Sequence, residues 1–194
     1  MVRSYDPDRP ISRDRLNTLL NLAIRAPSAG HTQGWRFLVL DDITSRNRFW
    51  TATSDEIADP WRERMQAAPA LVVCFSNQQA YLDRYAEPDK GWTDRDVERW
   101  PIPYWHVDTG MAAMILLLAA QDEGLAACFF GVPTERWPAV FAEFDVPAGL
   151  TPVGVISLGY PAPDRRSPSL RRGRRALEEV VSYGSFGAGG ESTD

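Results

Sequence analysis

The sequence predicts one α+β domain, and three observations lead to that class. The chain has 194 residues, which suits a single domain, and 44% of them are hydrophobic, which is enough for a sizeable core. Helical and strand-like segments are mixed without the regular strand–helix–strand alternation of a parallel sheet. The longest apolar run, residues 111–120, is too short to span a membrane and is typical of a buried helix.

The first half of the chain is expected to hold an amphipathic helix and two strands. Ser12 has the side chain of an N-cap, and Pro27 ends the helix. Its apolar face repeats at helical spacing through Leu16, Leu19, Leu20, Ala23 and Ile24. Residues 35–40 read as a strand and residues 71–75 as a buried central strand. Residues 77–103 read as a long, mostly irregular excursion with some helix, of the kind that often forms a lid.

The second half begins with the strongest helical pattern, which starts at Tyr104 and ends at Gly124. This helix is apolar on every side, so it must be buried on every side, and a second subunit is a natural way to bury it. Strands are expected at 125–130 and 153–158, with a short helix near 134–143. We expect residues 1–182 to form one domain and residues 183–194 a flexible tail rich in Gly and Ser.

Composition excludes several classes of function. The formal net charge of −5 argues against nucleic-acid binding, and no apolar run suggests a membrane partner. The only cysteines, Cys74 and Cys128, sit in apolar runs and form no CxxC pair, which favours a reducing cytoplasm. No metal-binding motif is present, so we expect no metal site. Six arginines lie between Arg165 and Arg175, either as a solvated basic loop or as a phosphate-binding cluster.

Side-chain catalysis has little support in the sequence. A Walker motif, a nucleophile elbow and a dinucleotide-binding glycine motif are all missing, which favours a bound cofactor as the reactive group. The segment from Ala26 to Trp35 joins a helix end to a strand and offers a hydroxyl, an imidazole and an amide. By composition alone it is a turn.

At this segment the chain resembles the nitroreductase family of FMN enzymes, whose corresponding motif runs close to APSxxNxQPW. Here it stands as Ala26-Pro27-Ser28, His31, Gln33 and Trp35. Three further matches occur in the family's order: residues 2–11 with its opening motif, residues 108–131 with its buried helix and GLxxxxxG strand, and residues 172–181 with its basic carboxyl-terminal segment.

The resemblance implies a mixed, mainly antiparallel sheet flanked by helices, in an interlocked homodimer that binds FMN at the subunit interface. The expected FMN-binding residues are Arg3, Pro27, Ser28, Ala29, His31, Gln33, Phe130, Gly131, Arg172 and Arg174. Arg3 is expected at the ribityl or pyrimidine side, and the two late arginines at the phosphate. Residues 27–29 would reach the ring from the partner subunit, with Gln33 supporting their loop. No side chain is assigned a catalytic role, since a backbone N–H of Phe130 or Gly131 would stabilise charge at the flavin N5.

Three departures from the family pattern alter these expectations. The leading Arg-Arg-Ser of the opening motif is missing, so either the true start lies upstream or the phosphate is held by Arg172 and Arg174 alone. His31 stands where asparagine is usual, and either bonds the same groups or adds a titratable group. Gly34 replaces the usual proline, which is expected to loosen the loop.

The implied reaction is a ping-pong cycle in which NAD(P)H reduces FMN and a flat small-molecule acceptor, such as a nitroaromatic or quinone, reoxidises it. Two alternatives stay open: a flavin dehydrogenase or oxidase of one metabolite, and a flavin-binding protein without turnover. A deazaflavin in place of FMN is a further alternative. Trp92, Trp100, Tyr104 and Trp105 either roof the substrate pocket or belong to the core or dimer interface.

Overall fold

The computed structural model describes residues 2–54, 59–164 and 167–186. The chain divides into two compact units, Met1–Asp164 and Arg165–Asp194. The first unit holds every strand of the sheet and every α-helix of the described chain, and the second holds two short 3-10 helices, Pro168–Arg172 and Leu177–Glu179. The division between domain and tail that the sequence suggests, at residue 182, stays a prediction, and residues 187–194 of that tail lie outside the described residues.

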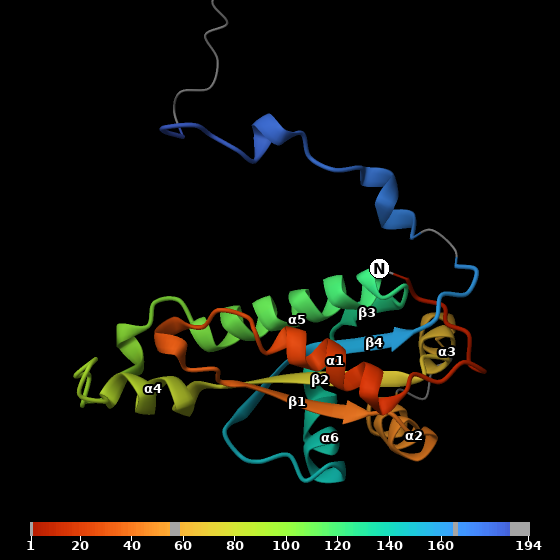
Figure 1. Cartoon of the computed structure of the whole chain (residues 1–194), viewed down its shortest axis with the longest axis horizontal. Coiled ribbons are helices and arrows are strands. Elements are labelled where there is room, and N and C mark those ends of the chain that lie inside the picture. The colour runs from red at the N-terminus through yellow and green to blue at the C-terminus, as the bar shows by residue number, and fades with distance from the viewer. Residues whose placement is uncertain (1, 55–58, 165–166, 187–194) are drawn as a thin grey trace, which may run out of the picture. The chain divides into compact units, whose positions relative to one another are not determined.

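The first unit is a four-stranded antiparallel sheet with helices on both faces (Figure 1). The strands are β1 (Trp35–Leu40), β2 (Ala70–Asn77), β3 (Ala126–Phe130) and β4 (Leu150–Gly159), in the order β1-β2-β4-β3. Every pairing between these strands is antiparallel. The predicted class, an α+β fold with a mainly antiparallel sheet flanked by helices, is therefore confirmed.

The helices follow from local signals that were readable in part. Helix α1 (Arg13–Ala23) begins at Ser12, whose side chain accepts a hydrogen bond from the Arg15 amide, as predicted. Asp42, Asp59 and Asn77 cap α2 (Ile43–Ala52), α3 (Pro60–Gln66) and α4 (Gln78–Ala86) in the same way. Helices α5 (Tyr104–Asp122) and α6 (Trp137–Glu143) complete the set. Gly124 follows α5 with a φ of 69°, the left-handed conformation that ends a helix.

Two hydrophobic layers hold these helices on the sheet. Successive β2 side chains point to opposite faces, so Leu71, Val73 and Phe75 pack in one layer while Val72 and Cys74 pack in the other. The first layer joins the sheet to α2, α3 and α6, and the second joins it to α1 and α5 (Figure 1). Because β2 is covered on both faces, all residues from 70 to 76 are buried, as expected of a central strand.

Helix α5 is buried on only one side within a single chain. Its Ala112, Ala113 and Leu116 pack toward the sheet and α1. Its other side exposes an apolar stripe at three- and four-residue spacing, with Met114 51% and Leu118 58% exposed. The sequence predicts that a second subunit buries this side of α5, and for the single chain that stays a prediction.

A polar chain joins the start of α5 to the sheet. The Trp105 indole N–H donates to His106 Nε2 (3.1 Å), and His106 Nδ1 lies 2.8 Å from the hydroxyl of buried Ser76 on β2. An accepting Nε2 places the imidazole proton on Nδ1, so the ring is neutral and donates to Ser76. Burial holds the pKa of His106 below its usual value, which agrees with a neutral ring.

The segment between β2 and α5 is more ordered than the sequence suggested. Helix α4 occupies the first nine residues of this segment. Aromatic rings from α4, from the residues after it and from the start of α5 pack edge to face, with centroids 4.6–6.2 Å apart. The members of this aromatic cluster are Tyr81, Tyr85, Trp92, Trp100, Tyr104 and Trp105. Tyr81 is fully buried and Trp105 nearly so, which makes the cluster a small core of its own.

Candidate functional site

A cavity of about 420 Å³ lies at the end of strand β3. Its wall combines residues of α2, α3 and the segment that follows the strand: Trp50, Thr53, Asp59, Trp61, Arg62, Phe130, Gly131, Val132 and Pro133. The volume falls in the usual range for small-molecule and cofactor sites. Two of the residues predicted from the sequence, Phe130 and Gly131, therefore line one cavity.

Aromatic rings form one side of this cavity. The rings of Trp50 and Phe130 are stacked, with centroids 5.8 Å apart and planes 7° from parallel, and Trp61 meets Phe130 edge-on at 5.3 Å. Phe130 is only 8% exposed and its ring packs in the core. Flat, apolar walls of this kind suit a planar ring system.

The polar groups of the cavity offer hydrogen-bond donors. Trp50 Nε1 and Arg62 Nε are both buried without a hydrogen-bond partner, and the Arg62 guanidinium also donates to the Trp50 carbonyl. Gly131 is exposed, and a β-carbon built there meets no atom within 4 Å, so a ligand can approach its backbone closely. Buried donors without acceptors are costly. The cavity thus favours a planar ligand rich in acceptor atoms.

The predicted loop between α1 and β1 is a tight turn. Ala29–His31 form one turn of 3-10 helix, in which the His31 amide donates to the Ser28 carbonyl (2.9 Å). The Gln33 amide donates to the Ser28 hydroxyl oxygen (3.0 Å). Gly30, His31 and Gln33 have φ values of 59°, 55° and 54°, a region that non-glycine residues seldom adopt. Such a conformation persists only where the surroundings hold it.

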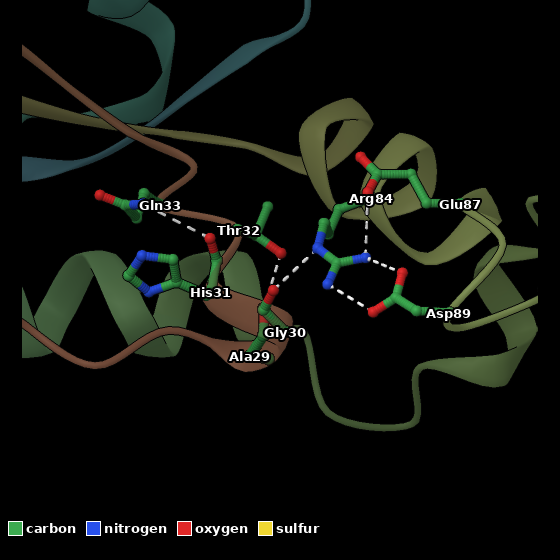
Figure 2. Close-up of polar contacts among 8 residues, drawn as sticks. All are labelled: Ala29, Gly30, His31, Thr32, Gln33, Arg84, Glu87 and Asp89. Carbon is green, nitrogen blue, oxygen red and sulfur yellow. Dashed lines mark hydrogen bonds and ion pairs between the residues drawn. The ribbon is translucent and has the colours of Figure 1, made fainter.

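Two contacts from outside the turn supply that restraint. The Ala29 amide donates to Asp108 Oδ2 (2.8 Å), and the Tyr81 hydroxyl donates to the same oxygen (2.7 Å). Asp108 is only 1% exposed. On the other side of the turn, Arg84 Nε donates to the Gly30 carbonyl (2.9 Å), as Figure 2 shows. Burial, and secondly the bond to Asp108, raises the pKa of Tyr81, so its hydroxyl stays a donor.

Gly34 does not loosen this turn as expected. A β-carbon at Gly34 would lie 2.4 Å from Cε2 of Tyr81, which is closer than any real contact. The residue is buried, and its φ lies outside the left-handed region. Glycine is therefore required here by the approach of the Tyr81 ring, and the turn is tightly packed.

The other predicted residues of the turn are placed at its surface. The side chains of Pro27, His31 and Gln33 are exposed, whereas Ser28 and Ala29 are partly covered. Gln33 Nε2 lies 3.5 Å from the His31 carbonyl, a long contact within the turn (Figure 2). The exposed imidazole and amide are thus free to meet a ligand or a second subunit.

Arg3 lies in an amino-terminal segment that runs along the edge of the sheet. The Val2 amide donates to the Ala127 carbonyl of β3 (3.2 Å), and the Arg3 amide donates to Asp164 (2.8 Å). Burial raises the pKa of the Cys128 thiol, and the nearby Arg3 side chain partly opposes that shift. Arg3 is therefore held beside β3, the strand that leads to Phe130.

The predicted phosphate ligands Arg172 and Arg174 belong to the second unit, in which both side chains are exposed. In that unit Arg175 forms an ion pair with Glu179 at 3.0 Å. Arg165 and Arg166 lie outside the described residues. A phosphate role for Arg172 and Arg174 stays a prediction.

Sequence reasoning missed several residues that line the cavity and several that hold the turn between α1 and β1. Trp50, Trp61 and Arg62 come from two helices that carry no motif, and only the structure brings them to Phe130. Asp108 gave a signal, because a carboxylate inside an otherwise apolar helix must find a buried partner. Tyr81 and Arg84 gave no signal of their own.

Within the described residues, His, Cys, Asp and Glu side chains form no group of three that is able to hold a metal ion. None of the helices in that part of the chain has the length and hydropathy needed to cross a bilayer.

A helix-flanked antiparallel sheet with an aromatic, donor-rich cavity defines a small-molecule or cofactor-binding α+β protein. The profile of the Nitroreductase family matches residues 1–160. The chain belongs to this family, which confirms the resemblance seen in its motifs and makes it an oxidoreductase.

Known proteins agree with this assignment. An Archaeoglobus fulgidus protein provisionally named NADH dehydrogenase/NAD(P)H nitroreductase is 28% identical over 166 residues, covering 84% of this chain and 82% of the relative. A nitroreductase-like protein from Streptococcus mutans has the same fold, with a TM-score of 0.72 at 19% identity over 94% of this chain and 92% of its own. A Staphylococcus epidermidis protein provisionally named NAD(P)H:FMN oxidoreductase superposes with a TM-score of 0.69 at 18% identity, covering 94% and 90%.

Proposed function

We propose that the protein is an FMN-dependent oxidoreductase that takes electrons from NADH or NADPH and delivers them to nitroaromatics, quinones or similar flat acceptors. The observation that carries this proposal is the cavity at the end of β3, where aromatic walls and unpaired donors meet the open backbone of Gly131. FMN, when bound, supplies the redox chemistry. The names of the Archaeoglobus and Staphylococcus relatives support the nicotinamide donor and the flavin.

The residues present fit a flavin. Its ring system is planar and carries carbonyl oxygens and ring nitrogens, which are acceptors for buried donors such as Trp50 Nε1 and Arg62 Nε. The backbone N–H of Phe130 or Gly131 donates a hydrogen bond where charge develops on the ring. Trp50, Phe130 and Trp61 exclude water from one side of the cavity. Arg3, Arg172 and Arg174 supply the guanidinium groups for the ribityl chain and phosphate.

The positions of the two halves of the predicted site support a dimer with shared sites. The turn of Ser28 and Ala29 leads into β1, and Phe130 ends β3, so the two halves of the predicted site belong to opposite edges of the sheet. Three strand spacings separate these edges, or about 14 Å. Moreover, Trp35 aligns through Ser76 with Thr151, whereas Phe130 aligns with Val155, further along β4. This separation supports a site in which the turn of one subunit serves the cavity of the other.

The apolar stripe of α5 supplies the surface for that dimer. Tyr104, Val107, Met111, Met114 and Leu118 recur at three- and four-residue spacing, and four of the five are more than 40% exposed. In a twofold dimer the stripe of one subunit packs against the same stripe of the other, so each of its residues is buried in both subunits. Two buried free thiols, Cys74 and Cys128, support a reducing compartment such as the cytoplasm.

A fluorescence titration tests flavin binding. Trp50 and Trp61 line the cavity, so FMN added to the flavin-free protein is expected to quench tryptophan emission, with saturation at one FMN per subunit. Riboflavin, which lacks the phosphate, is the matched control. Charge-assisted bonds from arginines contribute roughly 1.5–3 kcal/mol each, so FMN is expected to bind at least about tenfold more tightly than riboflavin.

Two outcomes of this titration would contradict parts of the proposal. If neither FMN nor riboflavin quenches the emission at concentrations far above those in a cell, the cavity does not hold a flavin. Equal affinities for the two would leave the flavin but remove the phosphate role of Arg172 and Arg174.

A further inference from the structure

The segment between β2 and α5 contacts the Ser28–His31 turn from two sides. Tyr81 and Arg84 are one helical turn apart on α4, and both reach toward the turn. Tyr81 acts through Asp108 of α5, whose carboxylate accepts a hydrogen bond from the Ala29 amide. Arg84 donates directly to the Gly30 carbonyl. The two contacts therefore hold adjacent residues of the turn, one through an N–H and one through a C=O.

Arg84 is itself fixed in place. Its Nη1 and Nη2 bond the two carboxylate oxygens of Asp89 at 2.6 and 2.7 Å, and Nη1 also lies 3.2 Å from Glu87 (Figure 2). This forked pairing orients the guanidinium, so that Nε remains directed at the Gly30 carbonyl. Figure 2 shows Arg84 between the acidic pair and the turn.

Packing adds a third restraint on the same turn. A β-carbon at Gly30 would lie 2.7 Å from the Tyr85 ring, and one at Gly34 would lie 2.4 Å from the Tyr81 ring. The turn thus rests directly on two rings of the aromatic cluster. Those rings pack against Trp92 and Trp100, which follow α4, and against Trp105 in the first turn of α5. Their place in this cluster argues against a lid that opens.

We propose that residues 78–108, from α4 to the first turns of α5, form a brace that holds the Ser28–His31 turn in its flavin-binding conformation. Tyr81, Asp108 and Arg84 are its positioning residues. The turn needs such a brace because His31 has a left-handed backbone conformation, which is costly for a residue other than glycine. A turn that is only partly in the competent conformation weakens binding in proportion to its lost population. The inference rests on the proposed function, since it concerns how the flavin site is preorganised.

Two variants remove one anchor each. Tyr81→Phe deletes the hydroxyl that bonds Asp108, and Arg84→Met deletes the donor to Gly30 while keeping a long side chain. Arg95→Met is the matched control, because Arg95 lies in the same segment and pairs with Asp83 instead of the turn. Because the two anchors are separate, a variant that fails to fold leaves the other to decide.

Hydrogen exchange and flavin affinity are measured on all four proteins. Without flavin, amides of residues 26–35 are expected to exchange faster in Tyr81→Phe and Arg84→Met than in wild type and Arg95→Met. The Kd for FMN is expected to rise about tenfold in the first two variants, as a tenfold loss of competent turn implies, and to stay within about twofold in the control.

The possible results separate the brace from the flavin itself. Unchanged exchange in both anchor variants overturns the brace, and so does faster exchange with an unchanged Kd. If wild-type protein binds no FMN, the proposed function fails, and the exchange measurement alone decides: retained protection overturns the brace, and lost protection upholds it.

Discussion

Leu118→Asp is expected to convert the proposed dimer to a monomer. Leu118 is 58% exposed on the apolar stripe of α5, and the substitution places a charge there. Burying a leucine side chain contributes roughly 1.5–3 kcal/mol, and a twofold interface contains each residue twice. Even half of that gain, together with the cost of burying two carboxylates, raises the dimer dissociation constant by at least about 100-fold. Sedimentation velocity measures the change directly.

The same variant is expected to lose FMN affinity, because in the proposed dimer each site takes its Ser28–Ala29 turn from the other subunit. Ile43→Asp is the matched control: Ile43 is 61% exposed, but it lies on α2, away from the stripe. The control should remain dimeric. A Leu118→Asp protein that sediments as a dimer would show that α5 does not form the interface, and a monomer that binds FMN at full affinity would show that one subunit suffices.

Gly34→Ala is expected to destabilise the fold strongly. The new methyl group would overlap the Tyr81 ring, which is fully buried, bonded through its hydroxyl to Asp108 and packed against Trp100 and Trp105. The ring therefore has little room to yield. Overpacking of this kind costs about 1–3 kcal/mol, which corresponds to a fall in melting temperature of roughly 3–10 °C for a chain of this size. Thermal unfolding followed by circular dichroism measures it.

A double-mutant cycle ties that loss to the Tyr81 ring. In a Tyr81→Ala background the ring is gone, so Gly34→Ala should cost far less than in the wild type, with a coupling of at least about 1 kcal/mol. Equal costs in the two backgrounds would mean that the methyl group meets another obstacle, of which the Asn77 carbonyl, 3.2 Å from the added carbon, is the nearest.

Much of the fold could be predicted, because its signals are local. The cap at Ser12, the leucine spacing of α1 and the apolar run of β2 each specify an element without reference to the rest of the chain. The order of the strands could not be read in this way. It depends on which strands pair across long separations, and the family resemblance implied only that the sheet is mixed and mainly antiparallel.

The residues of the candidate site also fall into those with a local signal in the sequence and those without one. Phe130 ends a strand with a recognisable motif and Gly131 follows it, and both line a cavity. Trp50, Trp61 and Arg62 went unnoticed because their roles arise from packing between elements far apart in sequence. The expectation for Gly34 was wrong for a related reason: its tight contact is with Tyr81, which lies 47 positions along the chain (81 minus 34).

The most direct test of the central claim is the visible spectrum of the FMN-loaded, desalted protein as NADH or NADPH is added without oxygen. We expect the flavin to be retained and its yellow absorption to bleach within a turnover, and then to return when a quinone or nitroaromatic is added. A retained flavin that neither nicotinamide bleaches would contradict the proposed enzyme and leave a flavin protein with another reductant or with no turnover.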